Sequence, residues 1–198
     1  MNVCKSVAGN MKKIGVLALQ GAVREHVQML KKLGCETVTV MRVEDLAGLD
    51  GLVLPGGEST TMRKLLDRYE LLEPIRSLAN KGLPMFGTCA GLILLARDVV
   101  DYEPHLAVMD VKVARNSYGR QVDSFESLLH IKGIGDDIPA IFIRAPHIVT
   151  VGEQVEILAI YDEKIVLARD GHILGCSFHP ELTDDTRIMA YFINNMVG

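Results

Sequence analysis

One cysteine of this 198-residue chain stands where a thiol can act as a nucleophile. Cys89 lies between Gly87 and Gly91, after an apolar strand-like run (83–86) and before an apolar helix-like run (92–97). Glycines tolerate a strained backbone and close packing, so the side chain between them projects from the strand end over the first turn of the helix. A helix N-terminus also favours the thiolate, which is the nucleophilic form. The pattern predicts a nucleophile elbow, and a buried cysteine at a tight turn is the structural alternative.

A base and its orienting group occur late in the chain. His179 and Glu181 flank Pro180, directly after the strand-like run 172–178. If this segment is extended, residues two apart point to the same side, so the imidazole and the carboxylate can meet. Catalysis by a thiol needs an imidazole to move a proton and a third group to fix its tautomer. The alternatives are a surface strand end or a pair of metal ligands, although no third ligand occurs at a recognisable spacing.

A glycine-rich loop follows another short apolar strand. Gly56 and Gly57 come after the run 51–54, and we expect Ser59 or Thr60 to cap the helix that follows. Two consecutive glycines leave backbone N–H groups free to approach a ligand, as an oxyanion hole requires. A phosphate-binding loop is disfavoured because the lysine of that motif is missing. A purely structural turn is the other alternative.

The Pro-Gly-Gly loop, the Gly-x-Cys-x-Gly elbow and the late His-Pro-Glu resemble, in this order, the class I (triad-type) glutamine amidotransferases. The resemblance runs from about Lys12 to the C-terminus. Two further segments narrow it to the glutaminase subunits of pyridoxal 5'-phosphate synthase: 15–21, with Glu25 and His26 following, and 115–121. The most specific parts are 55–61 and 115–121, since other glutaminases of the class look different there.

The resemblance implies an activity and a set of site residues. L-glutamine would be hydrolysed to L-glutamate and ammonia through a glutamyl thioester, with Cys89, His179 and Glu181 as the catalytic triad. The backbone N–H groups of Gly57 and Ala90 would form the oxyanion hole. The residues expected in the glutamine pocket are Gly57, Glu58, Ser59, Arg115, Ile143 and Arg144. For either arginine, a solvated ion pair is the alternative to carboxylate binding.

The resemblance also implies a partner. Ammonia would pass to a (β/α)8-barrel synthase subunit in a hetero-oligomeric complex that makes pyridoxal 5'-phosphate, so this chain itself would need no cofactor and no metal. Three other functions stay open: a glutaminase serving another synthase, a γ-glutamyl peptidase, and a non-catalytic regulatory subunit. The intact Cys-His-Glu set argues against the last.

Composition is that of an ordinary globular protein, with 48% hydrophobic and 23% charged residues. A net charge of -4 disfavours nucleic acid or an anionic membrane as partner. The four cysteines show no metal or redox spacing, and we expect Cys35 and Cys176 to be buried thiols in a reducing cytoplasm. Residues 1–10 look like an extension or leader, and 11–198 like a single glutaminase domain with no transmembrane segment.

The elements that position these motifs follow a strand–helix rhythm in the first half. We expect strands at 14–19, 35–40, 52–54 and 84–87, and helices at 22–33, 61–69 and 72–81. Within the first helix, Val23, Val27, Met29 and Leu30 should point inward. Short strands follow at 107–114, 124–131, 140–144, 148–151, 155–161, 165–168 and 173–178, before a helix at 183–196 whose first turn holds Asp184 and Asp185.

This pattern predicts an α/β protein with the three-layer fold of class I glutamine amidotransferases. A mostly parallel central sheet would be flanked by helices, with additional short strands in the C-terminal half. Because ligands bind at the carboxyl ends of strands in such sheets, the glycine loop and the elbow should lie at one edge.

Overall fold

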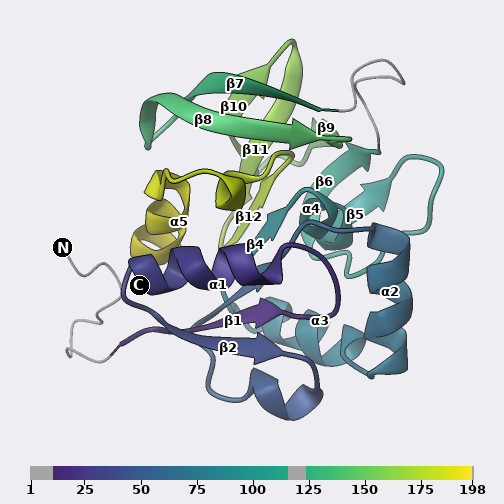
Figure 1. The fold of residues 1–198 in the computed structure, drawn as a ribbon. Helices are drawn as coiled ribbons and strands as arrows, with labels where there is room; N and C mark the ends of the chain where they lie inside the picture. The colour runs from purple at the N-terminus through teal and green to yellow at the C-terminus, as the bar shows by residue number, and fades with distance from the viewer. Residues whose placement is uncertain (1–10, 116–123, 198) are drawn as a thin grey trace.

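The computed structural model describes residues 11–115 and 124–197. Within them, ten strands form one sheet and two more form a separate hairpin (Figure 1). The sheet comprises β1 (Lys13–Leu17), β2 (Glu36–Val40), β3 (Gly51–Leu54), β4 (Met85–Thr88), β5 (Ala96–Val99), β6 (Met109–Ala114), β9 (His147–Val151), β10 (Glu156–Tyr161), β11 (Lys164–Asp170) and β12 (Ile173–Cys176). The hairpin comprises β7 (Ser124–Ile131) and β8 (Gly135–Ile143).

The sheet is parallel in one half and mostly antiparallel in the other. Its order is β2-β1-β3-β4-β12-β11-β9-β6-β5, and β10 pairs with β11 off this path. The pairings from β2 through β12 are parallel, whereas those of β11 and β9 with their neighbours are antiparallel. Since β4 and β12 are parallel neighbours with Thr88 opposite Cys176, the segments that follow them leave the sheet at the same edge.

Helices cover both faces of the sheet. They are α1 (Val23–Lys32), α2 (Ser59–Arg68), α3 (Leu72–Asn80), α4 (Ala90–Leu95) and α5 (Arg187–Phe192), with 3-10 turns η1 (Val43–Leu46) and η2 (Pro180–Leu182) and a π-helical turn η3 (Ile193–Val197). One buried cluster joins α1 and α5 to the sheet through residues such as Leu30 and Phe192, and a second joins α2, α3 and α4 through Met62, Ile75 and Leu92. The expected three-layer α/β fold is confirmed.

The inward face of α1 holds the four predicted residues and one that we did not predict. Met29 and Leu30 are buried in the core, and Val23 and Val27 are partly buried and pack against it. His26 is completely buried on the same face, three residues before Met29 and four before Leu30. The helical period thus places a polar ring in the interior beside the apolar side chains.

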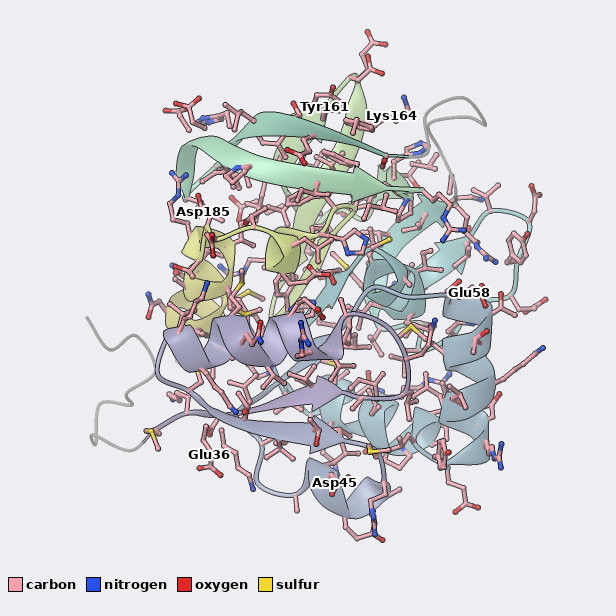
Figure 2. All side chains as sticks on the ribbon, viewed as in Figure 1. Glu36, Asp45, Glu58, Tyr161, Lys164 and Asp185 are labelled. Atoms are coloured by element: carbon pink, nitrogen blue, oxygen red, sulfur yellow. The ribbon has the colours of Figure 1, made fainter. Side chains whose placement is uncertain are left out.

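The last helix begins later than we expected. Asp184 and Asp185 precede α5 and do not form its first turn, and Figure 2 labels Asp185 in the segment before it. The carboxylate of Asp185 accepts a hydrogen bond from the Arg187 N–H (2.9 Å). An aspartate that bonds the backbone two residues on competes with helix formation, which accounts for the error.

Three other expectations need correction. The helix-like run 92–97 ends at Leu95, and Ala96–Val99 forms β5, which we did not predict. The strand expected at 140–144 begins earlier, at Gly135, and includes Pro139. In the described residues β8 pairs only with β7, so the N–H that proline lacks is not needed for a second strand. Cys176 is a buried free thiol as expected, but Cys35, although buried, is disulfide-bonded.

The predicted leader, 1–10, and most of the specific segment 115–121 lie outside the described residues. No helix in the described part of the chain is long and apolar enough to cross a membrane.

Candidate active site

The elbow at Cys89 forms between β4 and α4, as predicted. Cys89 has φ 49° and ψ -104°, so the left-handed conformation falls on the nucleophile itself and not on the flanking glycines. Those glycines serve close packing. A Cβ on Gly91 would overlap the carbonyl oxygen of Leu54, and one on Gly87 would lie 2.6 Å from the Gly91 oxygen. Short side chains would therefore push α4 away from the sheet.

His179 is held at the same edge of the sheet by β12, the parallel neighbour of β4, and by the β7–β8 hairpin. The backbone N–H of His179 donates a hydrogen bond to the carbonyl of Ile141 in β8 (2.8 Å). The ring of Phe142 packs against Phe178, with centroids 5.4 Å apart, and stacks on Phe125 of β7. The hairpin thereby braces the segment that carries the imidazole.

The imidazole and the Glu181 carboxylate meet, but not for the reason that we expected. Residues 180–182 form the 3-10 turn η2 and are not extended. The turn nevertheless brings Nδ1 of His179 to 2.7 Å from Oε1 of Glu181. The side chain of His179 is 10% exposed and that of Glu181 is fully buried.

The electrostatics of this pair favour an imidazolium beside a carboxylate. Burial by itself would lower the pKa of His179, but hydrogen bonds to Cys89 and Glu181 and the negative charges of both raise it to about 10. Burial would likewise raise the pKa of Glu181, yet the hydrogen bond from His179 brings it below its ordinary value. An ionised Glu181 can therefore orient and stabilise a cationic His179.

The glycine loop closes against Cys89 and His179. A Cβ built on Gly56 would lie 3.0 Å from His179 Nδ1 and 3.4 Å from Cys89 Cβ, so only a glycine fits between them. The Gly56 carbonyl accepts a hydrogen bond from Ala22 N–H (3.2 Å), and the Gln20 side chain accepts one from Glu58 N–H (2.7 Å). The turn before α1 thus sets the path of the loop.

A cavity of about 370 Å³ lies over the elbow. Its lining includes every predicted site residue except Glu181, which lies behind His179: Gly57, Glu58, Ser59, Cys89, Ala90, Arg115, Ile143, Arg144 and His179. Gln20, Gly21, Ala22, Gly56, Ile93 and Leu182 complete it. The volume and the few polar groups suit a small polar ligand.

Glu58 has a structural role that we assigned to Ser59 or Thr60. It is the N-cap of α2, where its carboxylate accepts hydrogen bonds from the N–H groups of Thr60 (3.0 Å) and Thr61 (2.7 Å); Figure 2 labels it at the start of this helix. Ser59 instead begins the helix, buried at the cavity, and its hydroxyl has no hydrogen-bond partner in the described residues.

Arg115 points across the cavity toward the start of α2. Its guanidinium lies 3.3 Å from Oε1 of Glu58 and 4.3 Å from the ring centroid of Tyr102. Both partners hold the cation at the rim. Arg144 lines the same cavity, with φ 43° directly after β8.

Sequence reasoning did not single out three residues of this neighbourhood: Gln20, His26 and Tyr102. His26 had a signal, because it shares the inward helical face of Met29 and Leu30. Gln20 lies in the turn after the first strand, which we expected near the glycine loop, but no role was predicted for its side chain. Tyr102 gave no signal at all, since its contact with Arg115 depends on the fold.

A metal centre is not supported. Among residues 11–115 and 124–197, no group of three or more His, Cys, Asp or Glu side chains could hold a metal ion.

Comparison with known proteins identifies the family. Residues 16–198 match the model of the SNO glutamine amidotransferase family. The chain belongs to this family. It is similar to the pyridoxal 5'-phosphate synthase subunit PdxT of Geobacillus thermodenitrificans, at 64% identity over 92% of this chain and 94% of that one. The PdxT of Bacillus mycoides is 56% identical over the same shares.

Solved structures agree. A crystal structure described as a glutamine amidotransferase matches with a TM-score of 0.89 and 47% identity, over 93% of this chain and 98% of that one. PurLQS from Thermotoga maritima, at 17% identity and a TM-score of 0.69, shares the fold. The resemblance to the glutaminase subunits of pyridoxal 5'-phosphate synthase is confirmed, and the chain is an enzyme of the glutamine amidotransferase family.

Proposed function

We propose that this chain hydrolyses L-glutamine with Cys89, His179 and Glu181. The observation that carries the proposal is the buried line of three groups. His179 and Cys89 lie on either side of Gly56, the thiol is one of the groups that raise the pKa of the imidazole, and Nδ1 of His179 is 2.7 Å from the carboxylate of Glu181. This is the arrangement of nucleophile, base and orienter that acyl transfer by a thiol needs.

The chemistry then follows in two stages. The Cys89 thiolate attacks the side-chain amide carbon, and the C–N bond breaks as His179 gives its proton to the leaving nitrogen. Ammonia departs and a glutamyl thioester remains. Water attacks the thioester, His179 takes its proton, and the C–S bond breaks to give glutamate and the thiolate. Glu181 holds the imidazole in one tautomer and stabilises its cationic form throughout.

Each tetrahedral intermediate carries an oxyanion that needs donors. The Ala90 N–H follows the nucleophile directly and belongs to the first turn of α4, where helical N–H groups have no partner within the helix. The Gly57 N–H is the second candidate, since Gly57 lines the cavity beside Cys89. Glu58, Ser59, Arg115, Ile143 and Arg144 would hold the glutamine, Arg115 as the partner of its carboxylate.

Ammonia is useful only if it reaches an acceptor before it is protonated and lost. The relatives at 56–64% identity are named as subunits of pyridoxal 5'-phosphate synthase. We propose that this chain delivers ammonia to the barrel subunit of such a synthase, in the cytoplasm. A γ-glutamyl peptidase would use the same triad but would prefer γ-glutamyl peptides to free glutamine, and comparing the two substrates distinguishes them.

Replacing single triad residues tests the mechanism. We expect Cys89→Ala to abolish ammonia release, His179→Asn to remove most of it, and Glu181→Gln to remove less, because orientation contributes less than proton transfer. Cys176→Ala is the matched control, since this second free thiol is buried outside the cavity. Near-normal ammonia release by folded Cys89→Ala protein, measured with the synthase present, would end the thiol mechanism.

A further inference from the structure

A second histidine lies behind the triad. His26, on the inward face of α1, has no exposed surface, and its Nε2 is 3.1 Å from Oγ1 of Thr88 and 3.5 Å from Oε2 of Glu181. Thr88 is the last residue of β4 and precedes the nucleophile. One ring nitrogen therefore approaches both the residue before Cys89 and the carboxylate that orients the catalytic imidazole.

The contact between His26 and Glu181 matters because one oxygen of the Glu181 carboxylate has no other donor in the described residues. Oε1 is occupied by His179, whereas Oε2 is buried and has no hydrogen bond of normal length within the described residues. A buried carboxylate oxygen without a donor is costly and favours the neutral acid, which cannot stabilise an imidazolium. His26 Nε2 is the donor within reach.

Charge and tautomer both suit a neutral donor. Burial lowers the pKa of His26, and this effect exceeds the opposing effect of Glu181; His179 lowers it further and Glu25 raises it. The ring is thus neutral near pH 7 and carries one proton. Within residues 11–115 and 124–197, Nδ1 is buried and has no partner, so placing the proton on Nε2 leaves no buried N–H of this ring unsatisfied. Cys176 is a further titratable group whose charge would interact with that of Glu181, and Cys89 interacts with His179.

We infer that His26 is a positioning residue of the glutaminase site, whose Nε2–H is shared between Thr88 Oγ1 and Glu181 Oε2 and keeps Glu181 ionised and aimed at His179. This role rests on the proposed function of the triad. It makes α1 a part of the catalytic apparatus, because the helix supplies the group that closes the line from Cys89 to Glu181.

Three substitutions of His26 distinguish loss of the Nε2–H hydrogen-bond donor from loss of the packing that the ring provides. Glutamine can place its amide nitrogen near the position of Nε2, asparagine places its nitrogen near that of Nδ1, and leucine fills the space with no donor. We expect His26→Leu and His26→Asn to lower kcat roughly tenfold or more with little change in KM, and His26→Gln to retain most of the activity. His172→Leu is the control, since this partly buried histidine bonds Ala79 and lies outside the cavity.

A second readout does not depend on glutamine. The rate of Cys89 alkylation by iodoacetamide, followed against pH, reports the formation of the thiolate–imidazolium pair. If His26 holds Glu181 ionised, the midpoint of this profile moves to higher pH in His26→Leu and His26→Asn and stays near wild type in His26→Gln. A structural role alone would change folding but not this midpoint.

The outcomes are separable. Equal kcat and equal alkylation profiles for folded His26→Gln and His26→Asn would overturn the inference, as would a wild-type profile in His26→Leu. If His26→Leu does not fold, the comparison of Gln with Asn still decides. Wild-type protein that releases no ammonia from glutamine with its synthase would refute the proposed function, while the alkylation profiles would still report whether His26 acts on the pair.

Discussion

Arg115 is the residue whose role in substrate binding can be measured most directly. Its side chain is 20% exposed, and Glu58 and Tyr102 hold it at the cavity. Because Glu58 already accepts hydrogen bonds from Thr60 and Thr61, its charge is only partly available to the guanidinium. The arginine can therefore serve a second carboxylate, that of the ligand.

We expect Arg115→Ala to raise KM for glutamine. A hydrogen bond to a charged group contributes about 1.5–3 kcal/mol, which corresponds to a rise of roughly 10- to 150-fold. Steady-state kinetics with the synthase present would measure it. Arg97→Ala is the matched control, because Arg97 pairs with Asp110 on the surface, away from the cavity. An unchanged KM in Arg115→Ala would return this arginine to the role of an ion-pair partner.

At the scale of single residues, the sequence predicts the groups that could react better than the residues that hold those groups in place. Cys89, His179 and Glu181 stand in short motifs whose residue types are unusual together, so the sequence alone predicts that they act together, and this stays a prediction. His26 and Tyr102 could not be predicted, because His26 meets Thr88 across 62 positions of the chain and Tyr102 meets Arg115 only after β5 and β6 have paired. Such contacts are products of the fold and leave no local pattern.

Among the elements, α2 depends on a capping carboxylate. Partial burial of the Glu58 carboxyl would raise its pKa. Hydrogen bonds from the Thr61 hydroxyl and from the N–H groups of Thr61 and Thr60 have the larger combined effect and lower the pKa to about 2. Since the unfolded value is near 4.5, the stabilisation is fully present above pH 4.5 and is lost as the pH falls toward 2.

We therefore expect Glu58→Ala to lower the free energy of unfolding by about 0.5–2 kcal/mol at pH 7, the usual effect of losing an N-cap. The difference from wild type should shrink as the pH falls from 4.5 toward 2. Denaturant unfolding at several pH values measures both. Glu73→Ala, in the first turn of α3, is the control. A difference independent of pH would show that the carboxylate is not the stabilising group.

The packing of α4 on β3 depends on Gly91. Because a Cβ there would overlap the Leu54 carbonyl, which is backbone and cannot rotate away, we expect Gly91→Ala to destabilise the protein by about 3 kcal/mol or more. Gly82→Ala is the comparison: Gly82 has φ 93° but open space around it, so its cost is limited to the backbone. Thermal unfolding compares them. Similar losses in the two variants would mean that α4 shifts at little cost.

Elements were predictable where hydrophobic periodicity was strong. The alternation from β1 to β4 appears within one to two residues of its predicted bounds. The start of α5 and the extension of β8 were not predictable, since the first depends on the side chain of Asp185 and the second on β7 lying opposite. Local capping and pairing partners decide such boundaries.

At the scale of the whole molecule, the glycine loop is hydrogen-bonded to the turn before α1. The Gly56 carbonyl is held by Ala22, and in a trans peptide the Gly57 N–H points the opposite way. Any rotation of this peptide must break that hydrogen bond. Residues 20–22 line the cavity, so a partner that docks over them would change the orientation of the donor.

We expect the isolated chain to be a poor glutaminase that its synthase activates. One missing oxyanion donor costs roughly 100- to 1000-fold in turnover, and a partner shifts the equilibrium only by binding one orientation better. Ammonia production over a titration of synthase, with binding measured separately, tests this expectation. Full activity without synthase, unchanged when a complex demonstrably forms, would indicate a preformed oxyanion hole.

The left-handed backbone conformation at Cys89 lowers the stability of the fold at the residue that we propose as the nucleophile. A side chain at φ 49° costs on the order of 1–3 kcal/mol, and the protein bears this cost in every folded molecule, whether or not substrate is bound. Glycine would remove the cost together with the thiol. Under the proposed mechanism, position 89 is therefore one at which a search for thermostable variants would favour loss of the nucleophile, and a screen for turnover would restore the cysteine.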